Sequence, residues 1–252
     1  MKAIIFAAGL GTRLKDITDD KPKALVEVNG VSLLEIALRK MKYFGFKDVI
    51  VNIHHQSEQI ETFINNLRYD DLRITVSDES SKLLGTGGGI KKVSGFFGGE
   101  EAFLAYNVDV ITNLDLGEFY RKHITSGALA TLAVRKRNTS RYLLVDDKNI
   151  LCGWYNEYTG ERIISRDKPE KLTSVAFSGI HIISTQLPGL ITEDGYCNII
   201  DVYLRLASDN DILTIEHNSD FWFDVGKPEQ VKEVSIFLKK NKETLPPELF
   251  GS

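Results

Sequence analysis

Glycines and cationic side chains near the start of the chain have the types and spacing of a phosphate-binding site. The turn Gly9-Leu10-Gly11-Thr12-Arg13 follows an apolar run, and Lys21 and Lys23 flank Pro22 shortly afterwards. Glycine lets backbone N–H groups come close to a ligand. Arginine offers a fork of donors that matches phosphate, and lysine offers a mobile point charge. These residues predict a site for a phosphorylated ligand.

Two common phosphate-binding fingerprints are absent from this turn. A dinucleotide fingerprint needs a third glycine or alanine three positions after Gly11, where Leu14 stands. A P-loop needs four residues between its glycines and then Gly-Lys-Ser/Thr, which the turn lacks.

A second glycine-rich stretch lies further along the chain. Four of the five residues from Gly85 to Gly89 are glycine. Because glycine loses much conformational entropy on folding, such a run favours close backbone approach to a flat or charged ligand over an ordinary surface loop.

Two aspartates follow apolar, aromatic-containing runs. Asp109 ends "FLAYNVD" and Asp224 ends "FWFD". Either one alone is explained by a turn or a helix cap. As a pair beyond strand ends, they predict carboxylate ligands for a hard cation such as Mg²⁺, which prefers oxygen.

The elements that position these residues alternate between strand and helix. Residues 2–8, 48–54, 72–78, 101–110 and 128–136 read as buried strands, with helical patterns between them. The helical stretch over 31–46 has Ser32 and Glu35 at capping-box spacing and Gly45 after its last turn. A short helix is expected near 89–97. The pattern predicts a mostly parallel sheet with helices on both faces.

The second half changes character. Residues 141–154 read as an antiparallel hairpin with a polar turn at Asp146–Asn149, and Pro228 opens a terminal helix. We expect a single domain over 1–252, with a nucleotide-binding lobe at 1–137 and a substrate-facing lobe with the C-terminal helix at 138–252, which the family resemblance described below implies is sugar-binding.

Composition excludes several classes. The chain has 252 residues, 42% of them hydrophobic and 26% charged, and a net charge of −4. These values predict no nucleic-acid partner and no membrane partner. Cys152 and Cys197 have no disulfide or metal spacing and are expected to be reduced. The first residues lack the features of a signal peptide, so we expect a soluble, cytoplasmic protein.

The motifs "FAAGLGTRL", "KPKALVEV", "GTGGGI", "NVD", "FSGI" and "WFDVG", in this order, resemble the sugar-1-phosphate nucleotidyltransferase family. "PKALVEV" and "GTGGGI" are most similar to the branch that contains N-acetylmuramate-1-phosphate uridylyltransferase. The resemblance implies a Rossmann-like three-layer α/β/α sandwich with a mostly parallel mixed sheet, of the GT-A-like kind. The chain departs from the family pattern at Asp16, where many relatives have proline, and at Val108, where glycine is commoner.

The resemblance also implies a reaction: Mg²⁺-dependent transfer of a nucleotidyl group from an NTP to a sugar 1-phosphate, with release of pyrophosphate. The leading pairs are UTP with N-acetylmuramate 1-phosphate and GTP with mannose or heptose 1-phosphate, for cell-envelope polysaccharide. Arg13 would hold the leaving pyrophosphate, Lys23 would neutralise the reacting phosphates, and Asp109, with these two, would complete the catalytic set. Asp109 and Asp224 would hold Mg²⁺.

Binding residues are implied in the same way. The nucleotide-binding residues would be Ala8, Gly9, Gly11, Thr12, Arg13, Gly85, Thr86 and Asn107. The sugar-phosphate-binding residues would be Asn156, Glu157 and Gly179, although turn polarity explains Asn156 and Glu157 equally well.

Two alternatives stay open. One is a catalytically silent domain that senses nucleotide or sugar on the same fold. The other is a phosphocholine cytidylyltransferase, whose acceptor needs an aromatic cage that Trp154, Tyr155, Tyr158 and Trp222 could supply. The base, the sugar and the choice between monomer and homo-oligomer are not fixed by the sequence.

Overall fold

The computed structural model describes residues 1–9, 21–166 and 171–250 and divides the chain into two compact units. Unit 1 comprises Met1–Leu83, Tyr106–Gly117 and Phe221–Ser252, and unit 2 comprises Leu84–Ala105 and Glu118–Asp220. The chain therefore enters each unit more than once. The predicted lobes, 1–137 and 138–252, are defined by the substrate that each would bind, and this division stays a prediction.

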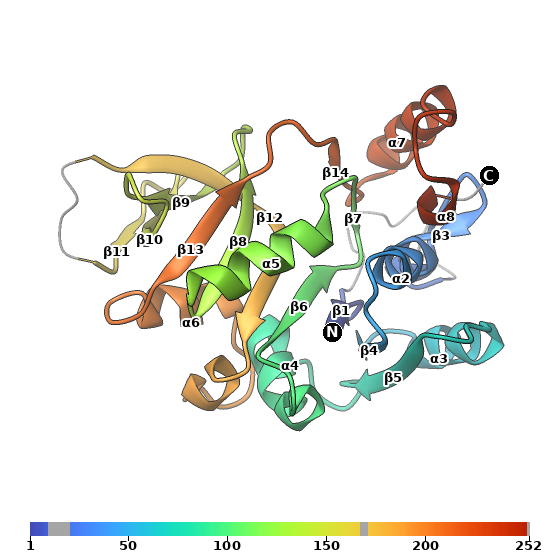
Figure 1. The fold of residues 1–252 in the computed structure, drawn as a ribbon, viewed down its shortest axis with the longest axis horizontal. Helices are drawn as coiled ribbons and strands as arrows, with labels where there is room; N and C mark the ends of the chain where they lie inside the picture. Colours follow the sequence, from blue (N-terminus) through green and yellow to red (C-terminus); the bar gives the residue numbers. More distant parts are fainter. Residues whose placement is uncertain (10–20, 167–170, 251–252) are drawn as a thin grey trace. The chain divides into compact units, whose positions relative to one another are not determined.

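Unit 1 is built on a parallel sheet whose strand order is β6-β1-β4-β5 (Figure 1). The strands of this sheet are β1 (Lys2–Phe6), β4 (Asp48–Ile53), β5 (Arg73–Asp78) and the end of β6 (Ala102–Asn107). Two small sheets of two strands each pair β2 (Glu27–Val28) with β3 (Val31–Ser32) and β7 (Val110–Thr112) with β14 (Trp222–Asp224). β1 pairs with β4 from Lys2↔Asp48 to Phe6↔Asn52. β1 and β4 are almost wholly buried because both faces of the sheet are covered there, whereas β5 at the edge is more exposed.

Local sequence explains the helices of unit 1, which are η2 (Lys23–Leu25), α2 (Leu33–Tyr43), α3 (Ser57–Asn66), α7 (Pro228–Lys240) and α8 (Pro247–Phe250). The Ser32 side chain accepts a hydrogen bond from Glu35 N, which confirms the predicted cap of α2, and Gly45 beyond its end has φ +78°. α7 begins with Pro228, as predicted.

Unit 2 contains a mixed sheet. Its strands are the start of β6, β8 (Ala130–Arg135), β9 (Arg141–Val145), β10 (Leu151–Asn156), β11 (Arg162–Ile164), β12 (Thr173–Ser184) and β13 (Ile212–Glu216). β12 lies between β6 and β9, β10 and β11 follow β9, and β8 pairs with both β12 and β13. The predicted hairpin is confirmed as β9 and β10, and its turn is closed by Asn149 N, which donates to Asp146 O at 3.1 Å.

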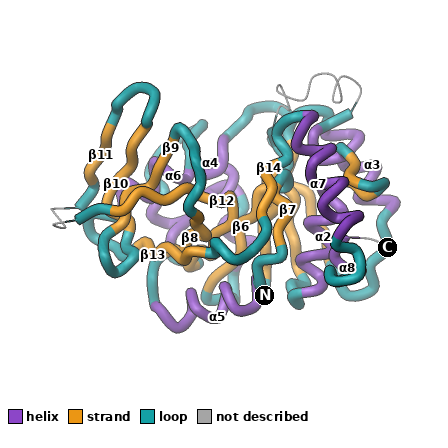
Figure 2. Tube along the Cα trace, turned by 90° about the horizontal axis from the view of Figure 1, so that it is seen from above, coloured by secondary structure: helices purple, strands orange, loops and turns teal. Residues whose placement is uncertain are grey.

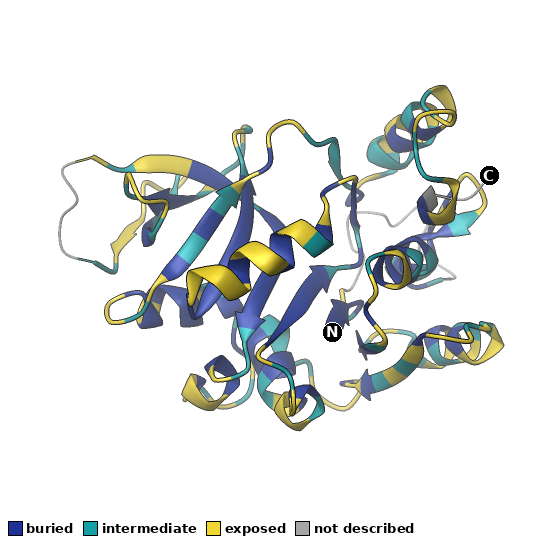
Figure 3. Ribbon diagram, viewed as in Figure 1, coloured by how far each residue is buried: buried dark blue, intermediate teal, exposed yellow. Residues whose placement is uncertain are grey.

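Helices cover both faces of the unit 2 sheet. They are α4 (Gly85–Lys92), η3 (Ser94–Phe97), α5 (Leu116–Ser126, whose first two residues belong to unit 1), η4 (Leu187–Leu190) and α6 (Ile199–Leu206). Figure 2 shows α5 on one side of the strands and α4 and α6 on the other. β8 is buried between these layers, whereas the outer face of α5 is exposed (Figure 3).

The predicted fold class, an α/β sandwich with a mostly parallel mixed sheet, is confirmed. One local expectation needs correction. The glycine run is not a loop that precedes a helix near 89–97; it forms α4 itself, which begins at Gly85. In the described part of the chain, no helix is long and apolar enough to span a bilayer.

Candidate active site

An ion pair joins two of the predicted catalytic residues within unit 1. Lys23 Nζ donates to Asp109 Oδ2, although 86 positions separate the two residues in sequence. The side chain of Lys23 is 10% exposed and that of Asp109 21%. A pair so shielded is held more firmly than an ion pair in open water. The structure thus brings together a cation and a carboxylate that the sequence could only nominate separately.

Backbone bonds fix the turn that carries Asp109. β6 ends at Asn107, three residues before the end of the predicted strand at Val110, and Val108 N donates to Phe6 O at 3.2 Å. Val108 is buried and has no positive φ, so the family's glycine is not needed here. The buried Tyr106 hydroxyl donates to Val110 O at 2.7 Å. Burial, and then the charge of Asp109, raise the pKa of Tyr106 well above its usual value, so it remains a neutral donor.

Asp224 lies beside this turn at the end of β14. β14 pairs antiparallel with β7, where Asp224 is opposite Val110, and Val225 N donates to Asp109 O at 2.8 Å. The two aspartates therefore occupy adjacent positions on neighbouring backbones. Half-buried, oxygen-only donors suit Mg²⁺, which is held by one or two carboxylates while phosphates and water complete its shell. The donor set fits the predicted cation.

A buried polar pair lies at the carboxyl ends of β4 and β5, also in unit 1. Asn52 Nδ2 donates to Glu79 Oε1 at 2.6 Å, and both side chains are about 1% exposed. His54 Nδ1 is 2.7 Å from Glu79 O. A carboxylate taken out of water requires such donors, so this pair holds the ends of the two strands together.

The glycines of α4 make close contacts with the chain itself in unit 2. Gly87 N donates to Cys197 O at 3.0 Å, and Ile199 N donates to Thr86 Oγ1 at 3.0 Å. A Cβ placed on Gly85 would lie 2.6 Å from Cys197 O, and one on Gly88 would lie 2.7 Å from Gly195 O. The segment 195–199 therefore packs closely against the backbone of this run. Nucleotide binding by Gly85 and Thr86 stays a prediction.

The remaining nucleotide-binding candidates lie close to the unit 1 strand ends or outside the described residues. Arg13, Gly11 and Thr12 belong to the latter. Ala8 is half-buried and Gly9 exposed just beyond β1, whereas Asn107 ends β6. Ala8, Gly9 and Asn107 are thus at the carboxyl edge of a parallel sheet, where ligands bind in such folds.

The predicted sugar-phosphate residues lie on two strands of unit 2: Asn156 ends β10, Glu157 follows it, and Gly179 lies within β12. Asn156 Oδ1 accepts hydrogen bonds from Tyr158 N at 3.0 Å and Thr159 N at 3.3 Å, so its side chain shapes the turn after β10. Glu157 is exposed in that turn. Gly179 has φ +77° and lies where the register of β12 against β8 shifts, between Phe177 and His181. Only a residue that tolerates this φ fits there.

Comparison with known proteins identifies the family. A family model of nucleotidyl transferases matches residues 2–241. The chain belongs to this family. The chain is 28% identical over 238 residues to the N-acetylmuramate alpha-1-phosphate uridylyltransferase of Caulobacter vibrioides, which covers 90% of this chain and 92% of the relative. It is 23% identical over 253 residues to the mannose-1-phosphate guanylyltransferase catalytic subunit beta of Dictyostelium discoideum, covering 98% and 67%.

A solved structure agrees with the fold of this nucleotidyltransferase. HddC from Yersinia pseudotuberculosis, complexed with GMP-PN, has a TM-score of 0.71 and 19% identity over 94% of this chain and 99% of that chain. The resemblance to sugar-1-phosphate nucleotidyltransferases drawn from the sequence motifs is thereby confirmed.

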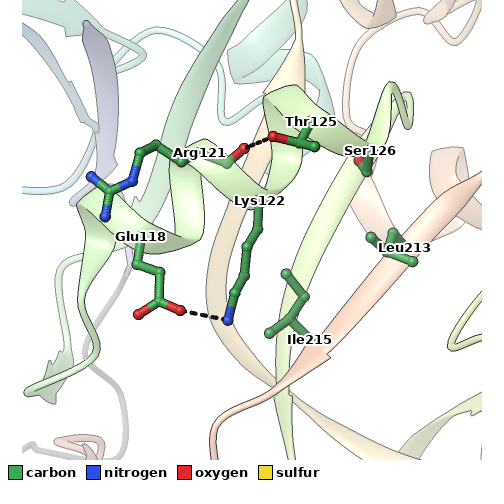
Figure 4. Close-up of a pocket in the computed structure, with 7 residues that line it drawn as sticks. All are labelled: Glu118, Arg121, Lys122, Thr125, Ser126, Leu213 and Ile215. Carbon is green, nitrogen blue, oxygen red and sulfur yellow. Dashed lines mark hydrogen bonds and ion pairs between the residues drawn. The ribbon is translucent and has the colours of Figure 1, made fainter.

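A shallow depression in unit 2 of the nucleotidyltransferase contains none of the predicted site residues. Charged and polar side chains of α5 stand over two apolar residues of β13 (Figure 4). The lining residues are Glu118, Arg121, Lys122, Thr125, Ser126, Leu213 and Ile215. Its floor is apolar, and on its rim Glu118 and Lys122 pair with each other beside Arg121.

Sequence reasoning missed Tyr106 and Lys40, whose side chains hold carbonyl groups of β7 and of the residues after it. Lys40 is 2% exposed in α2 and donates to the carbonyl groups of Thr112, the last residue of β7, and of Leu114. A signal was present: Lys40 lies seven residues after Leu33, on the helix face that also holds Ala37. A lysine at a core-facing position indicates a buried ammonium that needs partners.

Proposed function

We propose that this nucleotidyltransferase acts on a sugar 1-phosphate, with Mg²⁺ bound by Asp109 and Asp224. The observation that carries the proposal is the shielded Lys23–Asp109 ion pair next to Asp224. It brings one cationic side chain to a pair of carboxylates on hydrogen-bonded backbones, and a reaction between two phosphates needs such charges for neutralisation. The names of the relatives, which act on sugar 1-phosphates, supply the substrate class.

The proposed step is a displacement at phosphorus. A phosphate oxygen of the sugar 1-phosphate forms a bond to the α-phosphorus of the NTP, the bond from that phosphorus to the bridging oxygen breaks, and pyrophosphate leaves with the electron pair. The nucleophile is already anionic, so no side chain needs to remove a proton. The protein contributes position and neutralisation of charge. Bound Mg²⁺ would supply further neutralisation of the phosphate oxygens.

Lys23 and Asp109 must exchange partners for this step. In the free protein, the ammonium and the carboxylate neutralise each other at low exposure. With substrates present, Lys23 would turn to a phosphate oxygen and Asp109 to the cation. Both charges thus keep a partner in each state, and neither is left buried and uncompensated.

We propose UTP with N-acetylmuramate 1-phosphate as the first pair to test, because the Caulobacter vibrioides relative matches along nearly its whole length. GTP with mannose or heptose 1-phosphate is the second, supported by the Dictyostelium discoideum relative. Specificity depends on a few pocket contacts, so the pair must be measured.

The test is pyrophosphate release across UTP, GTP, CTP and dTTP against N-acetylmuramate, N-acetylglucosamine, glucose, mannose and heptose 1-phosphates and phosphocholine. We expect release with one sugar 1-phosphate, dependent on Mg²⁺, and a product of the mass of the NDP-sugar. Release only with phosphocholine would favour the cytidylyltransferase alternative. Nucleotide binding without release from any acceptor would favour the sensing domain. Lys23→Ala, purified in parallel, controls for a contaminating activity.

A further inference from the structure

A fully buried lysine of unit 1 has no role in the proposed reaction. Lys40 lies in the middle of α2 and is 2% exposed. Its Nζ donates to Thr112 O and to Leu114 O, each at 2.9 Å, and lies 5.0 Å from the centre of the Phe44 ring. Burying an ammonium costs free energy unless donors and charge are satisfied. An apolar residue would fill this position at lower cost if only packing of α2 were needed.

The two carbonyl acceptors belong to the end of β7 and the residues after it. Thr112 is the last residue of β7 and lies opposite Trp222 of β14. Its Oγ1 donates to Phe221 O at 2.6 Å and accepts from Leu114 N at 3.2 Å. Lys40 therefore holds the carbonyl group of Thr112, whose hydroxyl fastens the end of β7 to the residue before β14.

The β7–β14 ladder is short and carries the proposed metal ligands at its other end. It has three residue pairs, and Asp109 and Asp224 lie at the end opposite to Thr112. The Tyr106 hydroxyl fixes Val110 O near the aspartates, while Lys40 fixes the far end. An isolated two-stranded ladder is marginally stable, so its alignment depends on these side-chain tethers.

From this geometry we propose that Lys40 is a positioning residue, which holds the β7–β14 ladder in the register that places Asp109 and Asp224 together. The inference rests on the proposed metal-binding role of these aspartates. Lys40 touches neither aspartate; it acts through the backbone of β7 and thereby sets the spacing of the two carboxylates. Groups that hydrogen-bond metal ligands typically change metal affinity by about 10–100-fold when they are removed, and Lys40 acts one step further out, so we expect the lower end of this range.

The test compares Lys40→Met with two controls on the same helix. Met fills a similar volume without the ammonium. Leu38→Ala truncates a side chain that is fully buried, and so reports loss of α2 packing alone. Lys42→Met removes an exposed lysine that pairs with Asp71. Each protein is examined by amide hydrogen exchange of the β7 and β14 residues, by Mn²⁺ titration followed by electron paramagnetic resonance, and by thermal unfolding.

We expect Lys40→Met to speed exchange of the Val225 amide, which donates to Asp109 O, and to weaken Mn²⁺ binding by about tenfold. Leu38→Ala should lower the melting temperature and leave the Mn²⁺ affinity of the folded protein unchanged, and Lys42→Met should change neither. Lys40→Met with the Mn²⁺ affinity of the unaltered protein would overturn the inference, whether or not amide exchange changes. Asp109→Asn separates the two proposals: if this variant also binds Mn²⁺ normally, the metal-ligand assignment fails, and Lys40's role with it.

Discussion

Replacement of glycine by alanine within α4 tests whether glycine is required there because the segment 195–199 packs too closely for a side chain. Gly88 lies inside the helix, and its φ is in the ordinary range. A Cβ there would lie 2.7 Å from Gly195 O and 2.9 Å from Leu84 Cβ. Alanine in a helix interior is favoured over glycine by about 1 kcal/mol. Overpacking costs about 1–3 kcal/mol when the neighbour is backbone that must shift.

The free-energy cost of the steric overlap should exceed the free energy gained from the higher helix propensity of alanine. We therefore expect Gly88→Ala to lower the free energy of unfolding by up to about 2 kcal/mol. For a chain of this size, each kcal/mol corresponds to about 2–4 °C in melting temperature. The matched control is Gly95→Ala in η3, where a Cβ would meet nothing within 4 Å. This control should be neutral or slightly stabilising.

A double substitution makes the test sharper. A Cβ on Gly87 would lie 2.7 Å from Cys197 Sγ. Gly87→Ala should therefore destabilise the protein much less in a Cys197→Ala background than alone. Urea unfolding of the four proteins gives the coupling free energy directly. If Gly88→Ala stabilises the protein as Gly95→Ala does, and the double-mutant cycle shows no coupling, the close-packing argument is wrong. Normal stability with impaired NTP binding would instead assign the run to the ligand.

Three further predictions concern charged and polar side chains. Lys23→Ala should lower kcat by about 100-fold or more at saturating substrate, because the reacting phosphates lose a neutralising charge. The same variant should bind Mn²⁺ more tightly in the free protein, because the ammonium that competes for Asp109 is gone. Weaker Mn²⁺ binding would contradict the proposed exchange of partners. Asn52→Leu removes the donor to the buried Glu79 carboxylate and should cost about 1.5–3 kcal/mol in urea unfolding, and an unchanged unfolding midpoint would refute this. Burial lowers the pKa of His123 from 6.5 to about 4, so the neutral ring stabilises the fold above pH 6.5 and this contribution is lost as the pH falls towards 4. His123→Gln should therefore lose less stability than the unaltered protein over that range, and equal losses would refute the assignment.

Features set by short spacing along the chain could be predicted from sequence. The Ser32–Glu35 cap of α2, the proline that opens α7 and the Asp146–Asn149 turn each depend on residues within a few positions of one another. Such local signals act before any tertiary contact exists. The nomination of Lys23 and Asp109 was of the same kind, since it rested on residue type and short motifs.

The tertiary structure decided which of these residues meet. Asp109 and Asp224 become neighbours only because β14, near the C-terminus, pairs with β7, and no local pattern specifies that partner. The glycine run has the composition of a flexible loop but forms a helix, because the segment 195–199 packs closely against it and satisfies its backbone. Lys40 reads as a surface lysine by type, yet the helical period turns it inward, where two carbonyl groups hold it. In each case, the deciding contact joins residues far apart in sequence, so only the folded chain brings it about.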